Sequence, residues 1–327
     1  MTETRRVVML DPDWFGDVEV ERARFRRLLG EDVVVDAVDC PDEEIPEAIG
    51  PADVLLSHDT GVSADSMDAT GCSVIARYAT GVDGIDVDAA TSRGIRVTRV
   101  PTYCNDEVAT HAVSLALAFV RGLPVYDDAV ADGRWEWSDA APLQAVSDTT
   151  FGLLAFGNKG RATGEKATAL GFDVCAYDPG VADAEIESAG VRAVGFETLL
   201  AEADVLSIHT PLTPETANLI DAAAIDRLDD DAVLVNTARG HVVDEDALLD
   251  ALEADRLRGA GLDVLRSEPP EAENPLLGRD DVVVTPHAAW YSTRTADALR
   301  HRGTDIAVAA YEGEAVDGLV NPDALRR

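Results

Sequence analysis

Three short segments of the sequence carry polar side chains of the kinds that bind anions and move protons. They are Val235–Gly240 with Arg239, Gly261–Pro269 with Asp263 and Glu268, and Thr285–Ser292 with His287. Each segment follows or ends an apolar run that reads as a β-strand, and α/β sheets bind their ligands beyond the carboxyl ends of such strands. The arginine fork can bind an anion at two points, and a histidine can give or take a proton near neutral pH. Taken singly, each residue could equally be structural: a core histidine, a helix-flanking acid and a surface ion-pair partner.

A glycine turn supplies a second kind of site. The apolar run Thr150–Ala155 leads into Phe156-Gly157-Asn158-Lys159-Gly160 and then into a helical pattern. One glycine of such a turn lets the backbone approach a pyrophosphate, another lets helix and strand pack closely, and the helix N-terminus faces the phosphates. Asp178 ends the next strand, where it would meet ribose hydroxyls and repel the extra phosphate of NADP. The segment therefore predicts NAD binding, with NADP less favoured, although an ordinary strand–helix turn has the same outline.

Two residues of this turn depart from the usual pattern. Ala155 stands where the first glycine of G-x-G-x-x-G is usual, and we expect its backbone to remain at negative φ so that the methyl group is tolerated. Lys159 stands where an apolar residue is common. Its charge could lie near the phosphates or simply be solvated.

The elements that must position these residues alternate along the whole chain. Strands are predicted at Val7–Leu10, Val33–Val35, Val54–Ser57, Val74–Tyr78, Ile95–Thr98, Thr150–Ala155, Asp173–Tyr177, Val205–His209, Ala232–Asn236, Gly261–Val264 and Val282–Thr285. Helices are predicted at Val18–Leu29, Asn105–Arg121, Arg161–Leu170, Glu245–Leu252 and Thr293–Tyr311. Several strands are continuously apolar, as parallel strands covered on both faces are. The alternation predicts an α/β fold with two doubly wound parallel sheets of the Rossmann type.

The length of the chain favours two domains. At 327 residues it exceeds what one hydrophobic core usually supports. Pro101-Thr102 and Pro286–Ser292 resemble hinges. We predict a dinucleotide-binding domain at 103–290 and a substrate domain formed by 1–102 and 291–327, with a cleft between them. The first is an insertion in the second if the closing helix Thr293–Tyr311 packs on the first part of the chain. The almost wholly apolar stretch Asn105–Arg121 should be buried, and the boundary between the domains is one place for it.

The composition is strongly acidic. There are 27 basic and 62 acidic residues, which gives a net charge of −35, and Lys159 and Lys166 are the only lysines. Such a surface repels nucleic acid and anionic lipid. Recognition of cationic partners would explain the acids, but they are spread along the chain rather than gathered in a tail. We therefore favour adaptation to a salty cytoplasm.

The sequence also predicts a cytoplasmic protein without a metal site. Cys40, Cys72, Cys104 and Cys175 lie far apart, which argues against zinc or disulfides and favours buried thiols. Val7–Leu10 is too short for a signal peptide, and the longest apolar stretch falls well below the roughly 18 residues of a membrane span.

Several motifs in order resemble the D-isomer-specific 2-hydroxyacid dehydrogenases over essentially the whole chain. They are RYATGVDGID at Arg77–Asp86, VPTYCNDEVATH at Val100–His111, the glycine turn, HTPLTPET at His209–Thr216 and HAAWYS at His287–Ser292. The last run is similar to the branch that contains the C-terminal-binding-protein corepressors. The resemblance implies an NAD-dependent enzyme that interconverts a small D-2-hydroxy acid and its 2-keto acid.

The resemblance assigns the catalytic trio to Arg239, Glu268 and His287. Arg239 would bind the carboxylate and carbonyl of the acid. His287 would protonate the oxygen during reduction and take the hydroxyl proton during oxidation, while Glu268 orients the ring and favours its charged form. By the same resemblance, further positions are expected at the substrate and the coenzyme. The substrate would meet Ala79, Thr80, Gly81, Trp290 and Tyr103. The coenzyme would meet Ala155, Gly157, Asn158, Lys159, Gly160, Asp178, His209, Thr210, Pro211, Thr237, Ala238 and Asp263, the last at the nicotinamide carboxamide.

Other functions are compatible with parts of this pattern. A nucleotide-sensing, corepressor-like protein would also keep the coenzyme site, but it would not need His287. A formate dehydrogenase would carry a glutamine in place of Glu268. Phosphorylated acids such as phosphoglycerate remain open, although no basic cluster for a phosphate is evident. A packing role for Trp290 is also open. The resemblance further implies a homodimer.

Overall fold

The chain folds into two compact α/β units. The computed structural model describes residues 4–326. Unit 1 comprises Met1–Tyr103 and Ser292–Arg327, and unit 2 comprises Cys104–Tyr291. The predicted domain bounds differ from these by one residue at each junction.

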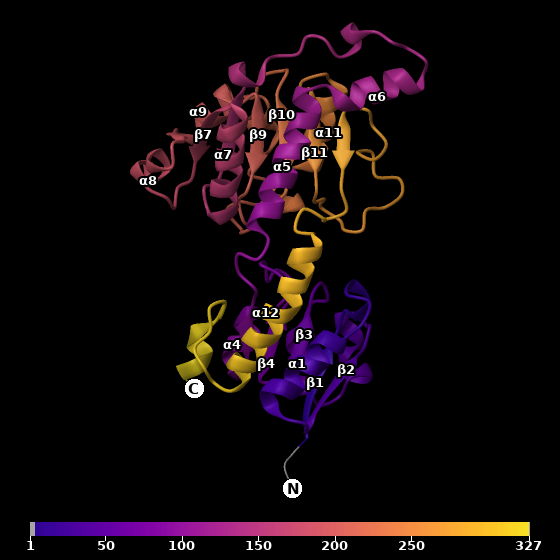
Figure 1. The fold of residues 1–327 in the computed structure, drawn as a ribbon, viewed down its shortest axis with the longest axis vertical. Coiled ribbons are helices and arrows are strands. Elements are labelled where there is room, and N and C mark those ends of the chain that lie inside the picture. The colour runs from indigo at the N-terminus through magenta and orange to yellow at the C-terminus, as the bar shows by residue number, and fades with distance from the viewer. Residues whose placement is uncertain (1–3, 327) are drawn as a thin grey trace. The chain divides into compact units, whose positions relative to one another are not determined.

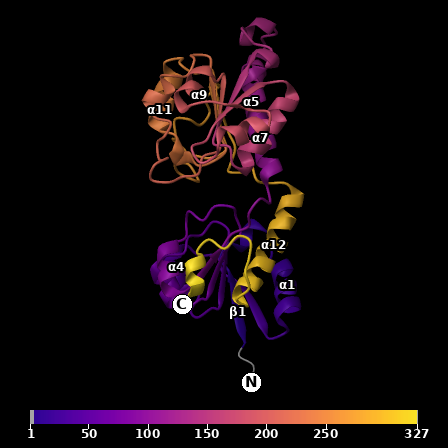
Figure 2. The ribbon, with the colours of Figure 1, turned by 90° about the vertical axis from the view of Figure 1, so that its left-hand side faces the viewer.

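Unit 1 is built on a five-stranded parallel sheet with the order β2-β1-β3-β4-β5. Its strands are β1 (Arg5–Met9), β2 (Val33–Ala37), β3 (Val54–Ser57), β4 (Val74–Arg77) and β5 (Arg96–Thr98). Its α-helices are α1 (Glu19–Leu29), α2 (Ile45–Ala48), α3 (Ala64–Thr70), α4 (Val87–Arg93) and α12 (Thr293–Tyr311). Helices α1 and α12 cover one side of the sheet and α4 the other (Figure 2). Because α12 returns to pack on α1 and β4, unit 2 is an insertion in unit 1, as predicted.

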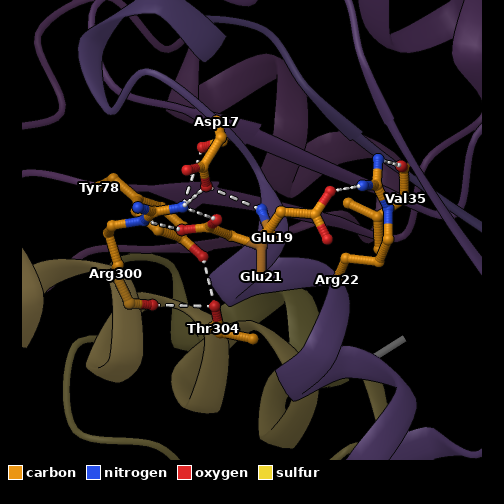
Figure 3. Close-up of polar contacts among 8 residues, drawn as sticks. All are labelled: Asp17, Glu19, Glu21, Arg22, Val35, Tyr78, Arg300 and Thr304. Atoms are coloured by element: carbon orange, nitrogen blue, oxygen red, sulfur yellow. Dashed lines mark hydrogen bonds and ion pairs between the residues drawn. The ribbon is translucent and has the colours of Figure 1, made fainter.

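A buried ion pair joins α1 and α12 (Figure 3). Arg300 donates to both carboxylate oxygens of Glu21, at 2.9 and 2.7 Å, and to the backbone oxygen of Asp17 at 2.9 Å. Glu21 is fully buried. Beside it, the hydroxyl of Tyr78 lies 2.8 Å from Oγ1 of Thr304, and burial raises the pKa of Tyr78 well above its usual value. The C-terminal helix is thus fixed to unit 1 by polar as well as apolar contacts.

Unit 2 is built on a seven-stranded parallel sheet with the order β12-β11-β10-β9-β6-β7-β8. Its strands are β6 (Thr150–Leu154), β7 (Asp173–Tyr177), β8 (Arg192–Ala193), β9 (Val205–Ile208), β10 (Val233–Asn236), β11 (Gly259–Leu262) and β12 (Val282–Val284). Its α-helices are α5 (Asn105–Val120), α6 (Leu123–Ala131), α7 (Asn158–Leu170), α8 (Asp183–Ser188), α9 (Phe196–Glu202), α10 (Ala222–Ile225) and α11 (Glu245–Glu253). Helices α5 and α7 lie on one face of the sheet, and α9 and α11 on the other (Figures 1 and 2).

The core of unit 2 explains the composition of α5. This helix packs on α7, β10 and β11 within its own unit, and most of its apolar side chains are buried there. The four cysteines are free and buried, as predicted. Within residues 4–326, no single helix is long and apolar enough to cross a membrane, and α5 with α6 reaches that composition only as a pair bent by 58°.

Two of the differences between the predicted and the observed elements concern the site and the exposed surface. The strand expected at Gly261–Val264 is β11 at Gly259–Leu262, because Asp263 turns away to hold the loop that follows β12. No element was predicted at α6, whose large apolar residues Leu123, Val125 and Val130 are exposed and therefore show no periodicity toward a core.

Candidate functional site

The glycine turn after β6 is tightly packed at Gly160. A Cβ on Gly160 would lie 2.3 Å from the carbonyl oxygen of Ala155, so only glycine fits there without movement. Gly157, by contrast, has an open position for a Cβ and immediately precedes α7. The turn therefore leaves its Gly157 side accessible to a ligand at the N-terminus of α7, while its Gly160 side locks the helix against the strand.

The expectation for Ala155 was wrong. Its φ is +79°, in the left-handed region that favours glycine. The chain must reverse here, because the Ala155 N–H bonds to the carbonyl of Tyr177 at 2.8 Å while its own carbonyl faces Gly160. The turn thus keeps the shape of the glycine motif at the cost of strain at one alanine.

Asp178 lies at this turn. Its Oδ2 accepts the N–H of Phe156 at 2.7 Å, and its Oδ1 accepts the N–H of Gly180 at 2.8 Å. The carboxylate is therefore fixed beside the glycine turn at the end of β7, where an acid contacts ribose hydroxyls in dinucleotide sites.

Two buried polar atoms near the same sheet edge lack hydrogen-bond partners within residues 4–326: Nδ1 of His209 and Oγ1 of Thr237. Burial, with the nearby charge of Lys159, lowers the pKa of His209 to about 3, so its ring is neutral at physiological pH. Its Nε2 faces Oγ of Ser207 at 3.0 Å. Buried polar atoms normally find partners, so these two fit a site that a polar ligand completes. Both are at positions expected to contact the dinucleotide.

The loop after β10 carries Arg239 against the loop after β11. A Cβ on Gly240 would lie 2.0 Å from the carbonyl carbon of Leu265, so the two backbones touch. The side chain of Asn236 braces the first loop by donating to the Arg239 carbonyl at 2.9 Å and accepting the Ala238 N–H at 3.0 Å. This contact brings Arg239 close enough to Glu268 for its charge to lower the pKa of that carboxyl.

Glu268 and His287 are paired directly. Oε2 of Glu268 lies 2.7 Å from Nδ1 of His287, and Oε1 accepts the N–H of Leu265 at 2.9 Å. Burial alone would raise the pKa of Glu268, but the hydrogen bond and charge of His287, followed by the Leu265 N–H and Arg239, bring it below the usual value. The structure therefore brings the predicted trio together in unit 2, with Glu268 ionised at neutral pH.

Asp263 shapes the loop that carries His287. Its carboxylate accepts the N–H groups of Ala288 at 2.8 Å and Ala289 at 2.9 Å, and its backbone oxygen accepts that of His287 at 2.8 Å. His287 has a φ of +50°. Because both carboxylate oxygens are used within the protein, the expected nicotinamide contact of Asp263 stays a prediction.

The other expected residues divide between the units. Trp290 lies in unit 2, with its ring edge-on to Tyr291 at 5.6 Å. Ala79, Thr80, Gly81 and Tyr103 belong to unit 1, where the Ala79 carbonyl accepts the Val100 N–H at 2.9 Å. Thr210 bonds through its hydroxyl to the Leu154 carbonyl at 3.2 Å, next to the glycine turn.

Two further polar residues were not singled out from the sequence. Arg77 ends β4 just before the 79–81 loop and is buried, with Nη1 donating to Oγ of Ser57 at 2.7 Å and to the carbonyl of Thr60 at 3.0 Å. His111 projects from the apolar helix α5 to Thr285. The available signal in each case was a polar residue interrupting an apolar strand or helix.

Comparisons with known proteins agree with this geometry. Residues 113–289, more than half of the chain, match the family model of the D-isomer specific 2-hydroxyacid dehydrogenase, NAD binding domain. The chain is 33% identical over 307 residues to a hydroxypyruvate reductase of Blautia hydrogenotrophica, covering 91% of this chain and 90% of that one. Among solved structures, a D-lactate dehydrogenase with NAD+ from Lactobacillus jensenii superposes with a TM-score of 0.77 at 27% identity, over 96% of this chain and 99% of that one.

A longer relative is also similar. The chain is 38% identical over 299 residues to a D-3-phosphoglycerate dehydrogenase of Mycobacterium bovis, which covers 90% of this chain and 56% of the relative. The chain thus spans only a little over half the length of that relative. None of these three proteins is named as a corepressor, so the corepressor-like branch stays a prediction.

Proposed function

Because the chain belongs to the D-isomer specific 2-hydroxyacid dehydrogenase family, we propose that it is an NAD(H)-dependent oxidoreductase that interconverts a small D-2-hydroxy acid and its 2-keto acid. The observation that carries the proposal is the 2.7 Å contact between Glu268 and His287, with Arg239 on the adjoining loop. An acid–base pair beside a fixed cation is what carbonyl reduction in a 2-keto acid requires.

The residues for the coenzyme fit a dinucleotide. The Gly157 side of the turn and the N-terminus of α7 would hold the pyrophosphate, and Asp178 the adenosine ribose. His209 and Thr237 offer a buried nitrogen and a buried hydroxyl that the protein leaves unpartnered within its described residues. When bound, the nicotinamide supplies the hydride for reduction or accepts it during oxidation.

The trio would handle charge and protons. Arg239 binds the carboxylate and polarises the carbonyl, as its fork geometry allows. As negative charge develops on the carbonyl oxygen, the charged imidazole of His287 donates the proton from its Nε2, since Nδ1 is bonded to Glu268. Ionised Glu268 stabilises that charged ring. In the oxidative direction neutral His287 takes the proton of the hydroxyl group.

The same family resemblance supports a substrate site at Ala79, Thr80, Gly81, Tyr103 and Trp290. Backbone N–H groups of the 79–81 loop would meet the substrate carboxylate. We favour a small unphosphorylated acid, because the sequence shows no basic cluster for a phosphate. The names of the relatives suggest hydroxypyruvate and the keto acids that correspond to lactate and to phosphoglycerate as compounds for the panel.

The test is NADH oxidation in high salt with a panel of small 2-keto acids, repeated with NADPH. The His287→Ala variant is compared with His241→Ala, an exposed histidine in the same unit. We expect turnover that falls by about 10²–10⁴-fold in His287→Ala and is kept in His241→Ala. Tight NADH binding by the folded protein without turnover of any acid would overturn the proposal and favour a nucleotide-sensing role.

We also propose that the enzyme is a cytoplasmic homodimer. The four free, buried thiols are typical of a protein in a reducing compartment such as the cytoplasm. The homodimer is proposed on a different observation, an exposed apolar patch. Helix α6 is labelled in Figure 1. This helix and the segment after it expose Leu123, Val130, Trp135 and Trp137, the last two at 84% and 80%. A two-fold interface uses the same patch of each copy. Since the acidic parts of the surface of two copies repel each other, we propose that this apolar patch forms the interface. Light scattering should give the mass of a dimer for wild type, and the variant Trp135→Ser/Trp137→Ser should dissociate to a monomer more readily. The mass of a monomer for wild type would disprove the homodimer.

A further inference from the structure

One polar side chain of the apolar helix α5 contacts the strand end that leads to His287. Nε2 of His111 lies 2.9 Å from Oγ1 of Thr285. Ala112, the next residue along α5, and Leu115, one turn further, are buried in the core of unit 2. About a quarter of the His111 side chain is exposed. The imidazole therefore lies at the margin of the core, beside the 285–289 loop.

The direction of the hydrogen bonds follows from the number of protons available. Oγ1 of Thr285 lies 2.6 Å from Oδ1 of Asp263, a carboxylate oxygen that can only accept. The single hydroxyl proton of Thr285 must therefore point at Asp263. The Thr285 oxygen then accepts from His111, which requires the proton of the imidazole to be on Nε2. The hydrogen bonds run from His111 through Thr285 to Asp263, and Nε2 of His111 itself lies 3.6 Å from the same Asp263 oxygen.

Asp263 links these hydrogen bonds to the loop that carries His287. Its carboxylate bonds to the N–H groups of Ala288 and Ala289, and its backbone oxygen to that of His287. Three successive N–H groups are thus tied to one residue. They hold His287 in the left-handed region at a φ of +50°, which a residue with a side chain seldom adopts unless its surroundings enforce it. This backbone conformation sets the ring at 2.7 Å from Glu268.

We propose that His111 is a positioning residue for His287, acting through Thr285 and Asp263. The proposal rests on the proposed dehydrogenase function for its kinetic consequences. The Nε2–H of His111 donates to the oxygen of Thr285, so that the Thr285 hydroxyl keeps donating to Asp263. This hydrogen bond fixes the carboxylate that holds the loop. His111 is not expected to touch the acid or to exchange protons with it.

The role requires a donor at the Nε2 position, and this separates it from simple packing. His111→Gln keeps an N–H donor at a similar reach, whereas His111→Leu keeps bulk without a donor. Thr285→Val keeps the shape of threonine and removes the hydroxyl. Thr110→Val on the exposed side of α5 is the control for a change in the helix itself.

We expect kcat to fall roughly 10- to 100-fold in His111→Leu and in Thr285→Val, with the KM for NADH and for the keto acid within about threefold of wild type. His111→Gln should stay within about fivefold of wild type, and Thr110→Val should match it. The double variant His111→Leu/Thr285→Val should be no slower than the slower single variant, because both break one chain of bonds.

Hydrogen exchange of the 285–291 segment gives a second readout that needs no turnover. Exchange should quicken in His111→Leu and Thr285→Val but not in His111→Gln. If wild type turns over no acid, the proposed function fails, and this exchange pattern still decides the role of His111. A loss in His111→Gln equal to that in His111→Leu, additive losses in the double variant, or unchanged exchange in His111→Leu would overturn the inference.

Discussion

Glu268 holds His287 with one carboxylate oxygen and its own loop with the other: Oε2 lies 2.7 Å from Nδ1 of the imidazole, and Oε1 lies 2.9 Å from the backbone nitrogen of Leu265. The contact with Leu265 therefore holds the Glu268 carboxylate in place independently of His287. Because Gly240 brings the Arg239 loop onto Leu265, the same stretch of backbone also sets the position of the cation. The trio is thus organised by contacts among the three loops that follow β10, β11 and β12.

Replacing Glu268 by glutamine should slow the enzyme without unfolding it. Glutamine keeps the shape and the bond to Leu265 but removes the charge that stabilises protonated His287. We expect kcat for keto-acid reduction to fall about 10- to 100-fold, since a positioned acid–base group contributes about 10²–10⁴-fold in all. Steady-state kinetics with NADH in excess measure the loss. Wild-type rates in Glu268→Gln would show that the carboxylate has no part in the reaction.

The pH dependence of that loss follows from the lowered pKa of Glu268. A carboxyl whose pKa is lowered in the folded protein stays ionised throughout the neutral range and is protonated only as pH falls below its usual value. Protonation of Glu268 should therefore cause no loss of rate in wild type until the pH falls below the usual pKa of a glutamate side chain. Parallel pH–rate profiles test this. An acid limb near pH 6 that appears in wild type and is absent from Glu268→Gln would contradict the ionised pair.

Ala155→Gly should stabilise unit 2. At a φ of +79° alanine bears roughly 1–2 kcal/mol of left-handed strain. Glycine removes this strain but adds about 0.4–1 kcal/mol of unfolded-state entropy. The net gain in the free energy of unfolding is therefore between zero and about 1.6 kcal/mol. Denaturant unfolding measures it. As the control, Ala162→Gly within α7 should lose about 1 kcal/mol. Equal losses at both positions would disprove strain at Ala155.

The strands were predicted well where burial on both sides made them continuously apolar. Val54–Ser57 and Asp173–Tyr177 have the predicted ends, and the strands that carry the trio's loops were all placed. Helix α6 could not be predicted from periodicity, since its large apolar side chains face outward. A periodic pattern of apolar residues indicates a helix only where the helix buries one face against the rest of its own chain.

The sequence proposed the residues of the site but not the contacts between them. The family resemblance proposed Arg239, Glu268 and His287 as the catalytic trio, and their side chains are of the kinds that acid–base chemistry requires. The backbone at Ala155 was mispredicted, since its positive φ accompanies a hydrogen bond to Tyr177, which lies on the next strand and outside the motif. The bond between His111 and Thr285 joins residues 174 positions apart, and only the folded sheet brings them together.

The buried pair between Arg300 and Glu21 should matter most when one partner is removed. Arg300→Met leaves the fully buried Glu21 without its cation, and we expect a loss of about 3–5 kcal/mol in the free energy of unfolding. Arg300→Met/Glu21→Leu should recover much of that loss, because the uncompensated charge is gone. Arg93→Gln breaks the exposed pair with Asp68 and should cost less than about 1 kcal/mol. A double variant as unstable as Arg300→Met would show that the loss comes from packing.

The net charge of −35 should make stability depend on salt. Self-repulsion among exposed carboxylates acts over a Debye length of about 10 Å at 0.1 M salt and about 3 Å at 1 M. We therefore expect Tm to rise steadily with NaCl over this range. Because salt also acts through apolar burial, the comparison is with Glu43→Gln/Glu44→Gln/Glu47→Gln, which removes three exposed charges from one short segment. If repulsion is the cause, this variant should unfold at a higher temperature in low salt, and its Tm should rise less with NaCl. Parallel salt dependences in the two proteins would instead assign the effect to apolar burial.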